Sequence, residues 1–189
     1  MNVYDFDNTI YRGESTFDLF LFYIKRCPSL IKMFPTVVKA LLRYKQGKVT
    51  LDEMITRYAP MVEAKILDVV DFENDPAVFW DAHMHKIKPF YKDLQRPDDL
   101  IITASPDFNI QEICKRLGIN NYLTSKINCK SGKIELICAR SNKIKAFFDA
   151  YPDCEIDNFY TDSPKNDKPL IDISKHAFVI KGEKITQIK

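Results

Sequence analysis

Apolar residues give way abruptly to turn-forming residues at the start of the chain. Val3 and Tyr4 form a short apolar run that leads into residues 5–9, whose sequence is DFDNT, and Gly13 follows. Short apolar runs bounded by Asp, Asn and Gly are typical of a buried strand that ends in a loop. We therefore predict a strand at the N-terminus, with Asp5 and Asp7 at its end.

From Ser15 to about Phe90, apolar residues recur at helical spacing and strand patterns are almost absent. Pro28-Ser29 separates two amphipathic stretches, residues 50–53 (TLDE) match a capping box, and Asp75-Pro76 starts a further helix. These signals predict a helical lobe. Its apolar positions include Phe17, Leu21, Tyr23 and Ile24, then Ile31, Phe34, Val38, Leu41 and Leu42, and finally Phe79 and Trp80.

After Pro89 the pattern changes to apolar strands that alternate with helices. Residues 100–103 and 156–160 are typical of buried strands, and residues 108–117 are typical of a helix that ends at Gly118. Continuous apolar strands separated by helices indicate a parallel sheet with crossover connections. We therefore predict an α/β fold with a doubly wound, mainly parallel, Rossmann-like sheet.

A hairpin and a domain division complete the predicted fold. The turn sequence KSGK separates two strand-like runs at residues 123–129 and 134–138. The α/β core is expected to comprise residues 1–13 and 90–189, and residues 14–89 are expected to form an inserted α-helical cap.

Composition indicates a folded protein with a sizeable core. Of the 189 residues, 46% are hydrophobic, 12% are aromatic and only 5 are Gly, which excludes disorder and collagen-like repeats. The net charge of +2 is far from the basic excess of nucleic-acid-binding proteins. No nucleic acid is therefore expected as a partner.

Cysteine usage and hydropathy indicate the compartment. The five cysteines are scattered and form no C-x-x-C pair, so neither a disulfide framework nor a zinc cage is predicted. The sequence has no signal-peptide pattern and no apolar run of about 18 uncharged residues. We expect a cytoplasmic protein without a stable membrane anchor, and the sequence indicates no oligomeric state.

Asp5 and Asp7 lie two residues apart at the end of the first predicted strand. Because side chains alternate along a strand, both carboxylates can face one crevice, and ligands of open α/β sheets bind at the carboxyl ends of the strands. Neighbouring carboxylates need a shared proton or a cation, and their hard oxygen atoms suit Mg²⁺. On spacing alone, residues 7–9 also fit a simple turn.

Three further segments carry polar residues near predicted strand or helix ends. Residues 103–105 (TAS) follow an apolar strand and precede a helix start, where free N–H groups attract phosphate. Lys143 lies at the start of a predicted helix, and Asp162 and Asp167 follow the strand at residues 156–160. Taken singly, each segment also fits a helix cap or a solvated residue.

Along the chain these segments supply an acid pair, a hydroxyl, a lysine and a second acid pair. This pattern resembles the haloacid dehalogenase-like superfamily, in particular its magnesium-dependent phosphatases. The family's first motif, D-x-D-x-T, matches residues 5–9 at every defined position, and its second, an apolar strand ending in Ser or Thr, matches residues 100–103. Its third motif, a lysine at a helix start, is best matched by Lys143. Its fourth, a spaced acid pair, is matched by Asp162 and Asp167, and the resemblance spans the whole chain.

The resemblance implies a role for each matching residue. Asp5 would attack phosphorus and form an aspartyl phosphate, while Asp7 would protonate the leaving alcohol and then activate water. The phosphate oxygens would be bound by Thr103, Ala104, Lys143 and helix N-terminal amides.

The resemblance also implies a Mg²⁺ site, with one position left open. The implied metal residues are Asp5, Asp7 through its main-chain carbonyl, Asp162 and Asp167. Thr161 stands where the family commonly has Gly, and the longer spacing of the fourth motif lets either Asn166 or Asp167 take the supporting position.

A helical insertion between the first and second motifs resembles the cap of the phosphoserine-phosphatase-like branch, which closes over the site and determines specificity. Glu14 stands where phosphoserine phosphatases carry a glutamate that contacts the substrate amine, and Arg57 could meet a substrate carboxylate. Both also fit simpler roles, Glu14 as an acid at a helix N-terminus and Arg57 as a solvated side chain. Phe79 and Trp80 are expected in the core of the lobe.

We therefore expect a Mg²⁺-dependent phosphomonoesterase that acts on a small phosphorylated metabolite. A phosphoserine phosphatase and a lipid phosphatase of the phosphatidylglycerophosphate type are the alternatives within this class. A phospho-accepting signalling domain has its acceptor after a later strand and lacks a helical lobe, so the motif order argues against it. A non-catalytic binding domain on the same scaffold would be expected to lose Asp5 or Asp7, and both are present.

Overall fold

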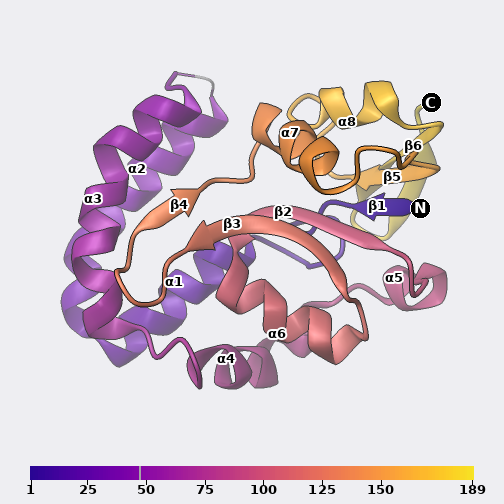
Figure 1. Ribbon diagram of the computed structural model, residues 1–189. Helices are drawn as coiled ribbons and strands as arrows, with labels where there is room; N and C mark the ends of the chain where they lie inside the picture. The colour runs from indigo at the N-terminus through magenta and orange to yellow at the C-terminus, as the bar shows by residue number, and fades with distance from the viewer. Residues whose placement is uncertain (47) are drawn as a thin grey trace.

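The described residues, 1–46 and 48–189 of the computed structural model, form one sheet of seven strands (Figure 1). The strands are β1 (Asn2–Tyr4), β2 (Leu100–Pro106), β3 (Asn121–Ile127), β4 (Ile134–Leu136), β5 (Asn158–Thr161), β6 (His176–Lys181) and β7 (Lys184–Gln187). Their order across the sheet is β4-β3-β2-β1-β5-β6-β7. The strands between the two edges pair in parallel, and β4 and β7 pair antiparallel at the edges. The predicted doubly wound, mainly parallel α/β sheet is confirmed.

Helices flank the sheet and also form a separate lobe. The helices are α1 (Ser15–Arg26), η1 (Pro28–Met33), α2 (Phe34–Lys45), α3 (Leu51–Val69), α4 (Asp75–His83), η2 (Met84–Lys86), α5 (Pro89–Leu94), α6 (Asp107–Leu117), α7 (Ser141–Ala150) and α8 (Lys168–Ile173). Figure 1 shows α7 and α8 over one face of the sheet and α4 and α6 over the other. It also shows the lobe helices α1, α2 and α3 beyond the carboxyl end of β3.

Two apolar layers hold the sheet between its helices because side chains alternate along the central strands. Val3 and Leu100 pack in one cluster with Phe147 of α7, whereas Tyr4 packs in the other cluster with Ile113 of α6. All five side chains are fully buried, and burial of one large apolar side chain contributes about 1.5–3 kcal/mol. The tightly packed strands therefore fix the positions of the polar residues that follow them.

Several element ends form as the sequence predicts. The main-chain N–H of Thr50 donates to the Glu53 carboxylate (2.8 Å) and the N–H of Glu53 donates to Thr50 Oγ1 (3.2 Å), which confirms the capping box. Gly118 ends α6 in the left-handed conformation, with φ at 71°. The predicted hairpin is present as the antiparallel pair β3 and β4.

Other elements differ from the sequence pattern. The strand expected at residues 156–160 begins two residues later, at Asn158, although Ile156 is buried beneath it. Strands β6 and β7 were not predicted. The four residues of β7 are exposed and carry no amphipathic pattern, whereas β6 contains an apolar run, with Ala177, Val179 and Ile180 buried, that would have indicated a strand. Pairing with the neighbouring strand, rather than local sequence, defines this edge.

Helix α4, which lies in the range expected for the cap, packs against α6 of the sheet layer. The indole Nε1 of Trp80 in α4 donates to the main-chain O of Asn109 in α6 (2.7 Å). Phe79 and Trp80 lie in one buried cluster with Tyr4 of β1 and with Leu19 and Tyr23 of α1, so the core of the lobe is continuous with that of the sheet. The cap boundaries at residues 14 and 89 stay a prediction. Among the described residues, no helix is both long and apolar enough to cross a membrane.

Candidate active site

The sheet order brings the sequence motifs to one edge. Strand β1 lies between β2 and β5, and all three run parallel. The residues that follow these strands are the DFDNT segment, the TAS segment and Asp162. Because the carboxyl ends of parallel strands meet at the same edge, these segments converge beside the N-terminus of α1.

A buried lysine joins two of the predicted acids into one cluster. Lys143 Nζ lies 2.6 Å from Asp5 Oδ1 and 3.0 Å from Asp167 Oδ1. All three side chains are almost fully buried, and Thr9 Oγ1 donates to the other oxygen of Asp5 (3.2 Å). We call Asp5, Lys143 and Asp167 the acid–lysine cluster. Its hydrogen bonds fix the Asp5 carboxylate at the end of β1.

Thr161 orients the second acid of the fourth motif. Its hydroxyl donates to Asp167 Oδ2 (2.6 Å), while its Oγ1 accepts from the N–H of Ser163 (2.9 Å). Asn166 is exposed and donates to Ser163 Oγ instead. The spacing of the fourth motif left Asn166 and Asp167 open. Of these two residues, Asp167 is the one that contacts Lys143 in the acid–lysine cluster. The threonine that replaces the family's usual glycine has a clear structural role.

Asp7 is held by a separate set of donors. The N–H of Ser15, the first residue of α1, donates to Asp7 Oδ1 (2.6 Å), and the hydroxyl of Ser105 donates to Oδ2 (2.7 Å). Ser105 Oγ also lies 2.8 Å from Ser15 Oγ and 2.9 Å from Thr16 Oγ1. Two oxygens bonded in this way leave the Asp7 side chain little freedom to rotate, so its position relative to Asp5 is fixed.

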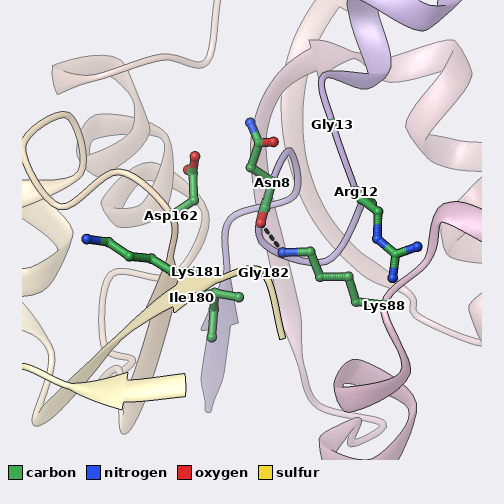
Figure 2. Close-up of a pocket in the computed structure, with 8 residues that line it drawn as sticks. All are labelled: Asn8, Arg12, Gly13, Lys88, Asp162, Ile180, Lys181 and Gly182. Atoms are coloured by element: carbon green, nitrogen blue, oxygen red, sulfur yellow. Dashed lines mark hydrogen bonds between the residues drawn. The ribbon is translucent and has the colours of Figure 1, made fainter. Parts of the chain in front are cut away.

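The loop between Asp7 and α1 is held by a hydrogen bond within it and by Lys88, which immediately precedes α5. Asn8 takes a left-handed conformation, with φ at 58°, and its N–H donates to the main-chain O of Gly13 (2.9 Å). Figure 2 shows the buried Lys88 directed at the main-chain O of Asn8, to which its ammonium donates. Burial lowers the pKa of Lys88. This loop geometry turns the chain from β1 into α1 immediately beside both aspartates.

The same loop forms one wall of a cavity of about 430 Å³. Asp162 lines this cavity together with three basic side chains, those of Arg12, Lys88 and Lys181 (Figure 2). Arg12 is also paired with Glu183 (2.8 Å) in the turn between β6 and β7. The charged side chains that line this cavity beside Asp162 are therefore all basic.

Electrostatics in the site are dominated by burial of carboxylates. Burial raises the pKa of Asp5, with Asp167 and Asp162 acting in the same direction and Lys143 opposing them. Burial also raises the pKa of Asp162, to about 6, and that of Asp7. Burial alone would lower the pKa of Lys143, but Asp5 and Asp167 outweigh it and hold that pKa well above its usual value. The single ammonium is surrounded by more carboxylates than it can neutralise.

This excess of carboxylate charge is the property that a divalent cation would relieve. In the part of the chain that the structure describes, no three His, Cys, Asp or Glu side chains are gathered as a complete metal cage. Mg²⁺ commonly binds only one or two protein carboxylates and completes its shell with water and substrate phosphate. Asp5 and Asp162, which interact electrostatically, fit that requirement. The carboxylates of Asp5, Asp7 and Asp167 also accept hydrogen bonds within the protein.

The TAS segment combines a buried hydroxyl with an accessible main chain. Thr103 is fully buried and its Oγ1 accepts from the N–H of Ser105 (3.1 Å). Ala104 is the exposed residue in this otherwise buried strand end, and its main-chain O accepts from Ser125 Oγ (2.6 Å). The main chain at Ala104 is thus anchored while its surface stays open to a ligand. The phosphate-binding roles of both residues stay predictions.

The two residues expected to set specificity have different placements. Glu14 immediately precedes α1 and accepts from Asn8 Nδ2 (3.0 Å), and its charge acts on both Asp7 and Asp162. Arg57 is exposed on α3, where its guanidinium lies 5.7 Å from the ring centre of Tyr58. The structure therefore brings Glu14 to the site but does not bring Arg57 there.

Three residues that contribute to the site were not selected from the sequence. Ser105, Thr161 and Lys88 are buried and bond to Asp7, Asp167 and the Asn8 carbonyl. Serine and threonine are common at strand ends, so nothing local distinguished them. Their partners are evident only in the fold, where β2, which carries Ser105, and β5, which carries Thr161, lie on either side of β1, and where Lys88 precedes α5.

The family model for haloacid dehalogenase-like hydrolases matches residues 3–172. The chain belongs to this family of hydrolases. The match runs from β1 into α8 and so contains both acid pairs, which confirms the expected family. No curated protein matched the chain in sequence.

Solved structures of other proteins share this fold. A protein of unknown function from Bordetella pertussis Tohama I has a TM-score of 0.71 at 16% identity, over 94% of this chain and 87% of that one. A phosphoserine phosphohydrolase-like protein from Francisella tularensis has a TM-score of 0.64 at 17% identity, over 97% and 88%. A probable phosphoserine phosphatase from Vibrio cholerae has a TM-score of 0.53 at 9% identity, over 93% and 55%. At these identities the likeness shows the shared fold of the haloacid dehalogenase-like hydrolases.

Proposed function

We propose that the chain is a Mg²⁺-dependent phosphomonoesterase that forms an aspartyl phosphate on Asp5. The observation that carries this proposal is the pairing of Asp5 with Lys143 at 2.6 Å, in a buried position at the carboxyl end of β1. A phosphate monoester reacts very slowly in water, so catalysis depends on positioning and on neutralising the transferred group. A fixed carboxylate beside a fixed ammonium offers both.

In the first step, an Asp5 carboxylate oxygen forms a bond to phosphorus while the bond between phosphorus and the alcohol oxygen breaks. Asp7 donates its proton to that leaving oxygen, and burial raises its pKa as such a role requires. Asp7, now ionised, then takes a proton from a water molecule whose oxygen attacks phosphorus. The bond from Asp5 to phosphorus breaks, which releases inorganic phosphate and regenerates both acids.

Charge on the phosphoryl group is balanced by several groups in this proposal. Lys143, Thr103 and the main chain at Ala104 bind phosphate oxygens, and Asp167 positions Lys143 through the 3.0 Å contact. Mg²⁺ bound by Asp5, Asp162 and the main-chain O of Asp7 would supply further positive charge. The substrate is a small phosphorylated molecule, and the expected cytoplasmic location stays a prediction.

The direct test is release of inorganic phosphate from para-nitrophenyl phosphate and from a panel of phosphorylated metabolites. We expect hydrolysis with Mg²⁺ and its loss after EDTA treatment, restored by added Mg²⁺, because the buried carboxylates need a cation to accept an anionic substrate. Absence of hydrolysis of every monoester with Mg²⁺ present would contradict the proposal.

Replacing Ser105 with alanine is expected to shift the pH profile of kcat to higher pH. The Ser105 hydroxyl donates to Asp7 Oδ2 and so stabilises the ionised form, which lowers the Asp7 pKa against the larger effect of burial. Without that bond Asp7 keeps its proton to higher pH, and any limb of the profile that Asp7 sets shifts by up to about one unit. The measurement is kcat against pH for wild type and S105A.

Ser174→Ala is the matched control, because Ser174 is equally buried, donates one hydrogen bond to a carbonyl and lies at the end of α8. Its profile is expected to match wild type. An S105A profile that stays in place, or moves to lower pH, would show that Ser105 does not tune Asp7.

A further inference from the structure

An apolar cavity of about 490 Å³ lies between the lobe helices and the sheet. Phe20, Val38 and Ile66 line it from α1, α2 and α3, and Phe108 and Ile127 line it from α6 and β3. This volume falls within the range of about 300–1,000 Å³ that is typical of ligand pockets. Nothing in the proposed chemistry at Asp5 and Asp7 uses this space.

The cavity comes close to Asp7, the general acid of the proposed reaction, although Asp7 does not line it. Glu14 and Thr16 are among its lining residues, and Thr16 Oγ1 lies 2.9 Å from Ser105 Oγ. Ser105 in turn donates to Asp7 Oδ2 (2.7 Å). The cavity wall at Thr16 therefore lies two hydrogen bonds from Asp7, the residue that would protonate the leaving oxygen.

The apolar lining determines what kind of leaving group fits. Glu14 and Lys65 are the charged residues of the lining, and the other lining residues except Thr16 are apolar or aromatic. The leaving group of phosphoserine would place most of its surface against apolar side chains, where burial of charge that lacks a partner is costly. A hydrocarbon tail has no charge to desolvate in the cavity. Each CH₂ group that it buries contributes about 0.8 kcal/mol, which is roughly a fourfold increase in the binding constant. The lining therefore favours an aliphatic leaving group.

The lobe also has the charge and exposed apolar residues suited to an anionic lipid surface. Between residues 19 and 51 the sequence holds seven Lys or Arg and no Asp or Glu. Ile31 and Leu42 in this stretch are 54% and 52% exposed, and Leu42 also lines the cavity. Basic residues and exposed aliphatic side chains together favour anionic lipid interfaces, and the cavity reaches the surface at this point.

We propose that the substrate is a single-tailed lipid phosphate taken from an anionic membrane surface, with its phosphate at Asp5 and its tail in the lobe cavity. This inference rests on the proposed phosphomonoesterase function and specifies its substrate class.

The first experiment compares alkyl monophosphates from ethyl to decyl, each below its micellar concentration, with phosphoserine as reference. We expect kcat/KM to rise about threefold or more per added CH₂ until the cavity is filled. Hydrolysis of ethyl phosphate without dependence on tail length, or a preference for phosphoserine, would overturn the inference and leave the proposed function intact. If no monoester is hydrolysed, the proposed function fails; calorimetric binding of decylphosphonate but not ethylphosphonate would still support the tail site, and equal binding of both would refute it.

Substitutions of residues that line the cavity test whether the alkyl tail binds there. The readout is the ratio of kcat/KM for decyl phosphate to that for ethyl phosphate, which cancels general losses of activity. Val38→Trp fills the cavity and is expected to lower this ratio at least tenfold, whereas Phe20→Ala enlarges the cavity and is expected to shift the optimum to longer tails. Val78→Trp is the matched control, because Val78 is exposed on α4 and does not line the cavity. An unchanged ratio in both cavity variants would contradict the assigned position.

The source of the substrate is tested with lysophosphatidic acid in vesicles. We expect faster hydrolysis in vesicles that contain phosphatidylglycerol than in vesicles of phosphatidylcholine alone, and this difference is expected to disappear at high salt. Hydrolysis of monomeric decyl phosphate with no activity on either vesicle would refute the membrane source.

Discussion

Replacing Asp5 with asparagine is expected to lower kcat for every phosphate monoester by about 10⁴-fold or more. The amide cannot attack phosphorus, so the aspartyl phosphate does not form. It keeps an oxygen that can accept from Lys143 or Thr9, both of which bond to Asp5 in the wild type. The variant is therefore expected to fold, with the loss confined to chemistry. Steady-state kinetics with Mg²⁺ and a thermal denaturation curve provide the measurement.

Asp172→Asn serves as the control for this experiment. Asp172 is an exposed carboxylate that pairs with Lys168 within α8, and its loss is expected to leave kcat unchanged. Acid-quenched wild-type enzyme is expected to carry phosphate on the peptide that contains Asp5. Phosphate on a different peptide, or Asp5→Asn activity within tenfold of wild type, would remove Asp5 from the nucleophile's position.

The part of the site that could be predicted lies where the chain itself enforces the geometry. Asp5 and Asp7 are two residues apart at the end of a buried strand, and this local spacing places both at the edge where ligands bind. Strand β2 was likewise evident from its apolar run, so the position of Thr103 followed from the sheet. In both cases the prediction required only the direction of one strand.

The contacts of Lys143 could not be obtained in this way. Lys143 and Lys145 lie two residues apart on α7, yet Lys143 is 5% exposed and Lys145 is exposed. The hydropathy pattern does not distinguish them, because the difference arises from packing of α7 against the sheet. Family resemblance selected Lys143, and the fold supplies the physical reason through Asp5 and Asp167.

The packing of the lobe helices around a cavity was the least predictable part of the structure. The sequence indicated its helices, but helix periodicity alone does not show how three amphipathic helices enclose a space. The cavity depends on distances between α1, α2 and α3 that are set by tertiary packing. For the same reason, Arg57 was a candidate from its place on the helix, but its side chain is exposed and lines neither cavity.

Replacing Lys143 with methionine is expected to destabilise the folded protein by about 3–5 kcal/mol at pH 8, besides abolishing activity. The ammonium is the shared partner of Asp5 and Asp167, and its removal leaves buried carboxylates without a cation. The pKa of Asp5, which burial already raises in the folded state, then rises further above its value in the unfolded chain, because the opposing effect of Lys143 is removed. Carboxyl groups of this kind favour folding at low pH, and this contribution is lost as pH rises. The destabilisation relative to wild type should therefore be largest at pH 8 and shrink toward pH 5.5.

Urea denaturation in EDTA at several pH values measures this difference without interference from a bound metal. Lys145→Met on the exposed side of α7 is the matched control, and we expect it to change the free energy of unfolding by less than about 0.5 kcal/mol. The double variant Lys143→Met/Asp167→Asn should recover part of the loss, because it removes one of the unpaired charges. A loss that is independent of pH, or no recovery in the double variant, would mean that Lys143 stabilises the fold through packing of its aliphatic chain. In that case neutralising the two carboxylates would not be its structural role.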